Sequence, residues 1–275
     1  MICEKRLFLF DIDGVIRLGD SIIDGAIDLY EEIRKVGGKS IFITNNSTKS
    51  VSSYVELFKK YGFENVDESN FLTALTVTKK FLKNRYGDKL IYAWGTQSFI
   101  DELTGYGLNV TTNKDDYAKI EAVIVGYNNE LTFKSLCDIC EVLQRSDAEY
   151  FATNTDWICP VTFGFIPDCG GICKLIALAT GKMPTFLGKP EPNMVQDALS
   201  ENPQYSREQC VVIGDRLYTD IACGIKSNVD SCVVFTGEAT REDMKTTEFQ
   251  ATYKYNSVKE IYVDLKNGNN ACEEK

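Results

Sequence analysis

Polar and charged residues come soon after four short apolar segments of the sequence. They are Asp11 and Asp13 after LFLF, Thr44, Asn45, Asn46 and Ser47 after SIFI, Lys189 after TFLG, and Asp215 and Asp220 after CVVI. Ligands of open α/β sheets bind outside the carboxyl ends of the strands. If the four segments are strands of one sheet, these residues can meet in a single site.

The carboxylates are the strongest chemical signal. Asp11 and Asp13 are two residues apart, the spacing that turns strand side chains to the same side. Two neighbouring carboxylates repel unless a cation or a shared proton lies between them. Mg²⁺ prefers oxygen ligands, so the sequence predicts a magnesium site made by Asp11, Asp13 and Asp215. Asp220 has a second interpretation, as an acidic residue at the N-terminus of a helix.

The remaining residues suit a phosphoryl group. Thr44 offers a hydroxyl, and Asn45 and Asn46 offer amides, although the same residues are typical of a strand end followed by a turn. Lys189 can supply the positive charge that an anion needs in an acidic protein. Its alternative interpretation is a solvated surface lysine.

Apolar segments alternate with helical patterns along the chain, which predicts an α/β fold with a mainly parallel sheet. We expect strands at 6–10, 39–44, 89–95, 121–127, 148–154, 185–188, 210–215 and 231–235. We expect helices at 24–36, 50–61, 69–84, 96–105, 132–145, 171–180, 191–200 and 219–227. Ser69 is the expected N-cap of the third helix. The polar tail from Lys266 is expected to fray.

Composition excludes several classes of protein. The chain has 275 residues, 44% hydrophobic and 25% charged, as in ordinary globular proteins. Its net charge of −10 disfavours binding to nucleic acid or anionic membranes. No apolar run approaches the roughly 20 residues of a membrane span. Because Asp11 interrupts the apolar N-terminal segment, we expect a core strand there, not a signal peptide, and a cytoplasmic protein.

The sequence contains no histidine and ten cysteines. The missing histidine excludes Ser–His, Cys–His and histidine–metal mechanisms. The pairs Cys137/Cys140 and Cys169/Cys173 could be pooled as a zinc site, but the first lies within an expected helix. Neither pair is expected at the start of a helix, as a thioredoxin-like redox motif would be. Buried thiols are therefore the favoured interpretation.

The motifs FDIDGVI, ITNNSTKS, GKPEP and GDRLYTD resemble, in this order, the four signature motifs of the haloacid dehalogenase superfamily. The segment from ATNTDWICP to GKPEP is similar to the NagD and p-nitrophenyl phosphatase branch. The resemblance covers about residues 6–236. It implies a Rossmann-like core at 1–83 and 183–275, with an inserted α/β cap domain at 84–182.

The resemblance also implies a role for each motif residue. Asp11 corresponds to the nucleophile and Asp13 to the general acid/base. The phosphate-binding and supporting positions correspond to Thr44, Asn45, Asn46 and Lys189, the magnesium ligand to Asp215, and the carboxylate supporting that region to Asp220. In the cap, Asn154, Asp156 and Trp157 are expected to contact the substrate. The cap motif reads TNTD here, where the family has TNPD.

These observations predict a Mg²⁺-dependent phosphatase that hydrolyses small phosphate monoesters through a phosphoaspartate. Its partner would be a small phosphorylated metabolite such as a sugar phosphate or a nucleoside monophosphate, and caps of this branch suggest a homodimer. A phosphotransferase or mutase would use the same intermediate. A receiver-like signalling domain would also use aspartates, a threonine and a lysine, but it would lack the D-x-D pair and the insertion.

Overall fold

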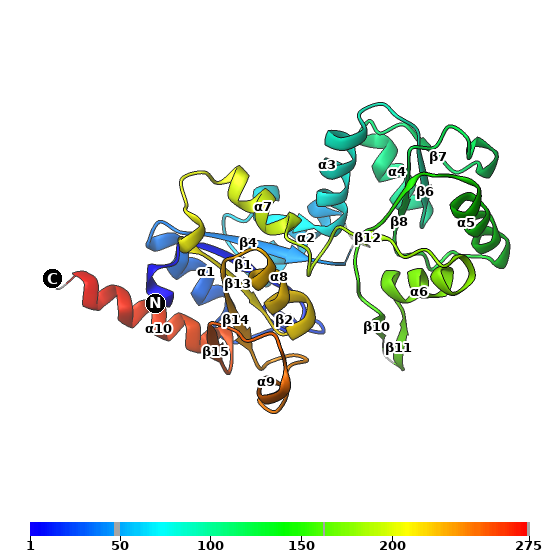
Figure 1. The fold of residues 1–275 in the computed structure, drawn as a ribbon. Coiled ribbons are helices and arrows are strands. Elements are labelled where there is room, and N and C mark those ends of the chain that lie inside the picture. The colour runs from blue at the N-terminus through cyan, green and yellow to red at the C-terminus, as the bar shows by residue number, and fades with distance from the viewer. Residues whose placement is uncertain (47–49, 162, 274–275) are drawn as a thin grey trace. The chain divides into compact units, whose positions relative to one another are not determined.

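The computed structural model describes residues 1–46, 50–161 and 163–273. Its internal contacts divide the chain into two units, coloured by residue number in Figure 1. Unit 1 comprises Met1–Thr44, Lys49–Leu72 and Lys189–Lys275, and unit 2 comprises Asn45–Thr48 and Thr73–Gly188. Unit 2 is thus an insertion in the sequence of unit 1. It is wider than the 84–182 segment expected from the sequence, because the residues from Thr73 to Lys83 and from Met183 to Gly188 also belong to it.

Unit 1 is built on a six-stranded sheet with the order β15-β14-β13-β1-β4-β5. Its strands are β1 (Leu7–Phe10), β4 (Lys39–Thr44), β5 (Phe71–Thr73), β13 (Cys210–Gly214), β14 (Asp230–Val234) and β15 (Tyr253–Tyr255). In the centre, β1 lies parallel to both β13 and β4, with Leu7 opposite Cys210 and Lys39. The mainly parallel α/β architecture expected from the sequence is confirmed.

Helices and one small hairpin complete unit 1. The helices are α1 (Ala26–Lys35), α2 (Val51–Tyr61), α7 (Asn193–Glu201), α8 (Ala222–Lys226), α9 (Asp243–Thr246) and α10 (Val258–Glu273), with short 3₁₀ turns η1 (Ile2–Glu4), η2 (Glu68–Asn70) and η4 (Arg207–Gln209) and the π-helical turn η5 (Leu217–Ile221). The hairpin consists of β2 (Arg17–Leu18) and β3 (Ser21–Ile22), which are antiparallel.

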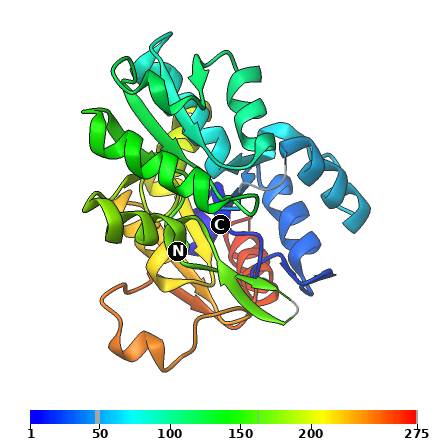
Figure 2. The ribbon, with the colours of Figure 1, turned by 90° about the vertical axis from the view of Figure 1, so that its right-hand side faces the viewer.

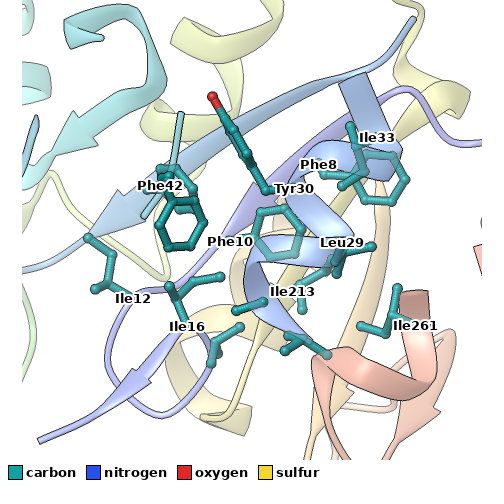
Figure 3. Packing of buried hydrophobic residues seen from close by; sticks show 14 of the residues in the cluster. Phe8, Phe10, Ile12, Ile16, Leu29, Tyr30, Ile33, Phe42, Ile213 and Ile261 are labelled. Atoms are coloured by element: carbon teal, nitrogen blue, oxygen red, sulfur yellow. The ribbon is translucent and has the colours of Figure 1, made fainter. Parts of the chain in front are cut away.

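The core of unit 1 is rich in aromatic rings. All four residues of β1 are buried, which explains why its sequence is apolar without alternation. Figure 3 shows Phe8, Phe10 and Phe42 among the packed side chains of this core. The ring of Phe42 lies 4.5 Å from that of Phe58 in α2. This packing fixes the ends of β1 and β4, where the polar motif residues begin.

The C-terminal segment is helical to Glu273, so the expectation of a frayed tail from Lys266 is wrong. Val258, Ile261 and Leu265 are fully buried, and their spacing of three and four residues places them on one face of α10. Helix α10 packs against α1 and η1 (Figure 1). The apolar face at the start of the helix holds it in place, and the polar residues after Leu265 continue the same helix.

Unit 2 has its own five-stranded parallel sheet with the order β12-β9-β8-β6-β7. Its strands are β6 (Ile91–Trp94), β7 (Val110–Thr111), β8 (Ala122–Val125), β9 (Glu149–Ala152) and β12 (Thr185–Phe186), and its helices are α3 (Ala74–Tyr86), α4 (Gln97–Gly105), α5 (Phe133–Arg145) and α6 (Cys169–Thr180), with the 3₁₀ turn η3 (Lys114–Asp116). A separate antiparallel hairpin of β10 (Ile158–Val161) and β11 (Gly164–Pro167) is visible in green in Figure 2.

Side-chain caps explain why α3 and α6 start at other residues than the sequence predicted. Helix α3 begins at Ala74, not at Ser69, because Thr73 caps it by accepting a hydrogen bond from the backbone of Thr76. Ser69 lies in η2, whose N-cap is Asp67. Helix α6 begins at Cys169, not at Gly171, because the carboxylate of Asp168 accepts from the backbone N–H of Cys169. Cys169 therefore does open a helix, contrary to the expectation.

Nine cysteines are free, namely Cys3, Cys137, Cys140, Cys159, Cys169, Cys173, Cys210, Cys223 and Cys232. Cys169 and Cys173 are buried, as expected, whereas Cys137 is exposed. Within the described ranges, the residues whose positions suit a metal ion are carboxylates, and no cysteine is among them. None of the described helices combines the length and apolar character that a membrane span requires.

Candidate active site

Lys189 links two carboxylates from different parts of unit 1. Its ammonium donates to Oδ1 of Asp11, which follows β1, and to Oδ1 of Asp220, in η5, at 2.7 Å. It also donates to the backbone carbonyl of Ile43 in β4 at 3.4 Å. The Lys189 side chain is only 3% exposed, so the alternative of a solvated surface lysine is wrong. The structure thus joins the ends of β1 and β4 through one buried ammonium.

Asp220 is held by the π-helical turn in which it lies. Its Oδ2 accepts from the backbone N–H of Arg216 at 3.0 Å, and its Oδ1 accepts from Lys189. Its own backbone N–H donates to the carbonyl of Arg216 at 3.0 Å. Turns of this kind are frequent at functional sites. With both carboxylate oxygens already bound, Asp220 is placed to orient Lys189.

Asp215, at the end of β13, is oriented by a loop that the sequence analysis did not single out. Its Oδ2 accepts from the backbone N–H of Glu238 at 2.8 Å, and its carbonyl accepts from the N–H of Ala239 at 2.8 Å. The hydroxyl of Thr236 donates to the carbonyl of Gly14, beside the D-x-D motif. The loop from Thr236 to Ala239 therefore connects the ends of β14, β13 and β1.

Two glycines allow the backbone to approach the Asp215 carboxylate. A Cβ at Gly237 would lie 1.9 Å from Oδ2 of Asp215, and a Cβ at Gly14 would lie 2.4 Å from the same atom. Gly14 also has a φ of +88°, a conformation that other residues avoid. Neither position can hold a larger residue without moving Asp215.

One oxygen of each of Asp11, Asp215 and Asp220 lies within 4.8 Å of the others. Burial raises the pKa of Asp11 well above its usual range, against the effect of Lys189, and Asp220 and Asp215 raise it further. Burial and Asp220 raise the pKa of Asp215 to about 6. In this cluster three carboxylates face one ammonium, so the arrangement calls for an additional positive charge.

The residues present fit a divalent cation. Oδ1 of Asp215 is buried and has no hydrogen-bond partner among the described residues, which is unusual for a buried carboxylate oxygen. Asp11 and Asp215 can both offer an oxygen to a hard cation. Asp11 and Asp215 would therefore hold the metal, whereas Asp220 accepts a hydrogen bond from Lys189.

The Asp13 side chain does not join this cluster, which corrects the expectation that it converges with Asp11. Its Oδ1 forms an ion pair with Nη2 of Arg17 at 2.7 Å. The physical reason is that β1 ends at Phe10, and the chain then turns through Gly14, so the alternation of a strand no longer applies. The group of carboxylates whose positions suit a metal ion is therefore Asp11, Asp215 and Asp220, without Asp13.

The segment after β4 divides between the two units. Thr44 is buried at the end of β4, in unit 1. Asn45 and Asn46 are assigned to unit 2, where Nδ2 of Asn45 donates to Oδ1 of Asp156 at 3.3 Å. The side-chain amide of Asn45 is therefore directed at a carboxylate. Ser47, also expected near the phosphate, lies outside the described residues.

The expected substrate-contacting residues of unit 2 differ in exposure. Asn154 and Asp156 are buried, and Nδ2 of Asn154 donates to Oδ2 of Asp156 at 3.1 Å. Trp157 is 46% exposed. Asn154 and Asp156 thus stabilise the loop after β9, while the Trp157 ring is accessible on its surface.

Comparisons with known proteins agree with this arrangement. A family model described as haloacid dehalogenase-like hydrolase matches residues 8–109, and a second HAD hydrolase-like model matches residues 186–261. The acid sugar phosphatase of Staphylococcus haemolyticus is 29% identical over 94% of this chain and 96% of its own. That of Staphylococcus saprophyticus is 29% identical over 95% of this chain and 98% of its own.

Solved structures give the same result. The 4-nitrophenylphosphatase of Thermotoga maritima superposes with a TM-score of 0.87 at 29% identity, covering 96% of this chain and 98% of its own. NagD from E. coli K-12 superposes with a TM-score of 0.82 at 28% identity, covering 93% and 98%.

The chain therefore belongs to the haloacid dehalogenase superfamily of hydrolases. Within the superfamily it falls in the NagD-like branch, and it is a phosphatase, that is, a phosphoric monoester hydrolase. A receiver-like signalling role is thereby excluded.

Proposed function

We propose that this enzyme is a Mg²⁺-dependent phosphatase that hydrolyses small phosphate monoesters through a phosphoaspartate on Asp11. The observation that carries the proposal is the buried ammonium of Lys189 between Asp11 and Asp220, beside the unpartnered oxygen of Asp215. This arrangement provides a fixed nucleophile, a fixed positive charge and a place for a divalent cation. The names of the relatives, acid sugar phosphatase and 4-nitrophenylphosphatase, favour sugar phosphates and p-nitrophenyl phosphate as substrates.

The reaction proceeds in two displacements at phosphorus. An oxygen of Asp11 forms a bond to phosphorus while the ester P–O bond breaks, and Asp13 gives its proton to the departing alcohol oxygen. Asp13 then takes a proton from water, which attacks the acyl phosphate and releases inorganic phosphate and the Asp11 carboxylate. Lys189 and the hydroxyl of Thr44 stabilise negative charge on the phosphoryl oxygens. A bound Mg²⁺ adds positive charge at the same oxygens.

The dependence on metal can be tested by activity and, separately, by stability. Chelator should abolish hydrolysis of p-nitrophenyl phosphate and Mg²⁺ should restore it, whereas Ca²⁺ should support it poorly because its coordination is larger and looser. At about 100-fold above its Kd, Mg²⁺ should contribute about 2.7 kcal/mol of stability, seen as a rise in melting temperature of several degrees. Asp215→Asn should lose this rise, while the exposed Asp147→Asn should keep it. Full activity in chelator would contradict the proposal.

We further propose that unit 2 selects the leaving group through Trp157. The phosphoryl group is common to all substrates, so the residues that bind it cannot distinguish them. Trp157 offers an accessible flat face, which can stack on a sugar or an aromatic ring. Asn154 and Asp156 act by holding its loop.

Replacing Trp157 by alanine should change kcat/KM unequally across substrates, by about 2- to 10-fold between p-nitrophenyl phosphate, a sugar phosphate and a nucleoside monophosphate. Phe133→Ala, at an aromatic residue of unit 2 that is 80% exposed, is the control. A single common factor for all substrates would contradict a role in selection. Light scattering of both variants would show whether the residue instead serves the expected dimer between caps.

A further inference from the structure

Arg17 lies next to the proposed general acid but was not singled out by any motif. Its Nη2 is 2.7 Å from Oδ1 of Asp13, and its side chain is 13% exposed, whereas that of Asp13 is 47% exposed. A mostly buried guanidinium is thus directed at a half-exposed carboxylate. Ion pairs of this kind are screened less by water than those with both partners on the surface.

The backbone around Arg17 is fixed by hydrogen bonds. Its N–H donates to the carbonyl of Ile12 at 3.1 Å, and its carbonyl accepts from the N–H of Gly14 at 2.7 Å. Its Nη1 donates to the carbonyl of Gly19 at 3.1 Å. The turn from Ile12 to Gly19 therefore holds the guanidinium in place independently of Asp13.

The choice of arginine carries an energetic cost. Nε of Arg17 is buried and has no hydrogen-bond partner within the part of the chain that the structure describes, and an unsatisfied buried donor is unfavourable. An apolar residue would fill the same space without this cost. Locally unfavourable choices of this kind are expected where a residue serves function.

We propose that Arg17 is a positioning residue that fixes the Asp13 carboxylate for proton transfer to the leaving group. The inference rests on the proposed function. Arg17 binds Oδ1, so Oδ2, the oxygen outside this ion pair, carries the proton. In the first displacement the Oδ2–H bond breaks and an O–H bond forms on the departing alcohol, as the ester P–O bond breaks and the bond from Asp11 to phosphorus forms. Correct placement of a reacting group accounts for a large part of enzymatic rate enhancement.

The test compares esters whose leaving groups differ in their need for a proton. Nitrophenolate departs readily without one, whereas a sugar alkoxide does not. Since kcat/KM reports the steps up to transfer of the phosphoryl group, it is independent of the later hydrolysis. Arg17→Met should lower kcat/KM for a sugar phosphate about 10- to 100-fold, within the range of general acid catalysis, and for p-nitrophenyl phosphate less than about 3-fold. Arg17→Lys, which keeps the charge, should recover part of the loss.

Two further variants make the test specific. In an Asp13→Asn background, Arg17→Met should have no additional effect on the sugar phosphate, because the two residues act as one unit. Arg34→Met removes an arginine that pairs with Glu31 on α1 at 2.8 Å and should change neither ester.

Different results would contradict the role of Arg17 and the proposed function. An equal loss on both esters, or a full additional loss in the Asp13→Asn background, would overturn the role of Arg17. Neither result would affect the proposed function, which fails instead if Asp11→Asn keeps its activity.

Discussion

Asp11→Asn should lose phosphatase activity by about 10⁴-fold or more while the fold stays intact. An amide cannot form the acyl phosphate, and loss of a nucleophile that acts with other groups removes most of the catalysis. In the wild type, acid quenching during turnover with a labelled phosphate ester should trap label on the protein. In the variant no label should be trapped.

The variant should also be at least as stable as the wild type in the presence of chelator. Burial, together with Asp220 and Asp215, raises the pKa of Asp11 against the effect of Lys189, so its charged form is unfavourable without a cation. After the substitution, Lys189 keeps its partner Asp220 at 2.7 Å. The exposed Asp20→Asn is the matched control and should keep full activity. Substantial turnover by Asp11→Asn would exclude the covalent route.

Lys189→Met should lose both activity and stability. The substitution leaves Asp11 and Asp220 buried without their shared ammonium, and breaking a buried pair in this way costs about 3–5 kcal/mol. Turnover should fall on the order of 10³-fold, because the charge that stabilises the phosphoryl oxygens is also lost. Urea unfolding followed by circular dichroism would measure the first effect, and initial rates under folding conditions the second.

Lys254→Met, at an exposed lysine of β15, is the control for the loss of one positive charge. It should unfold within about 0.5 kcal/mol of the wild type, as surface substitutions usually do. If Lys189→Met were as stable as this control, the ammonium would not be holding the two carboxylates, and the explanation of the site would be wrong.

The sequence was sufficient to predict the strands that carry the site, because a fully buried strand such as β1 appears as an uninterrupted apolar segment. It also predicted that Asp11, Lys189, Asp215 and Asp220 would come together, because each lies beyond the carboxyl end of an apolar segment. The assumption of one sheet was wrong for Lys189, which follows β12 in the sheet of unit 2. It could not predict the direction of the Asp13 side chain. That direction depends on where β1 ends and on the turn at Gly14, neither of which is set by periodicity.

Contacts between residues far apart in the sequence could not be predicted either. The hydrogen bond from Asn45 to Asp156 joins residues far apart in the chain, and no local pattern indicates it. The loop from Thr236 to Ala239 could have been predicted from the sequence, because it follows the apolar segment SCVVF as the other motifs follow their apolar segments. Applying the same rule to that fifth segment would have drawn attention to Gly237. The C-terminal elements α9, β15 and α10 carry no motif and were missed altogether.

The insertion of unit 2 also has a consequence for how the chain folds. The pairing of β1 with β13 brings Leu7 beside Cys210, and all of unit 2 lies between them in the sequence. Closing so long a loop costs entropy, and contacts of this separation slow folding.

Folding of unit 2 would reduce the entropy cost of pairing β1 with β13, because its own sheet and cores can form first. Its two ends then lie together: the position of a Cβ on Gly188 would be 3.4 Å from that of Ala74. A folded unit 2 thus replaces a long loop by a short link, after which β1 and β13 can pair. Both tryptophans, Trp94 and Trp157, belong to unit 2. If unit 2 folds first, their fluorescence should recover during refolding before phosphatase activity does.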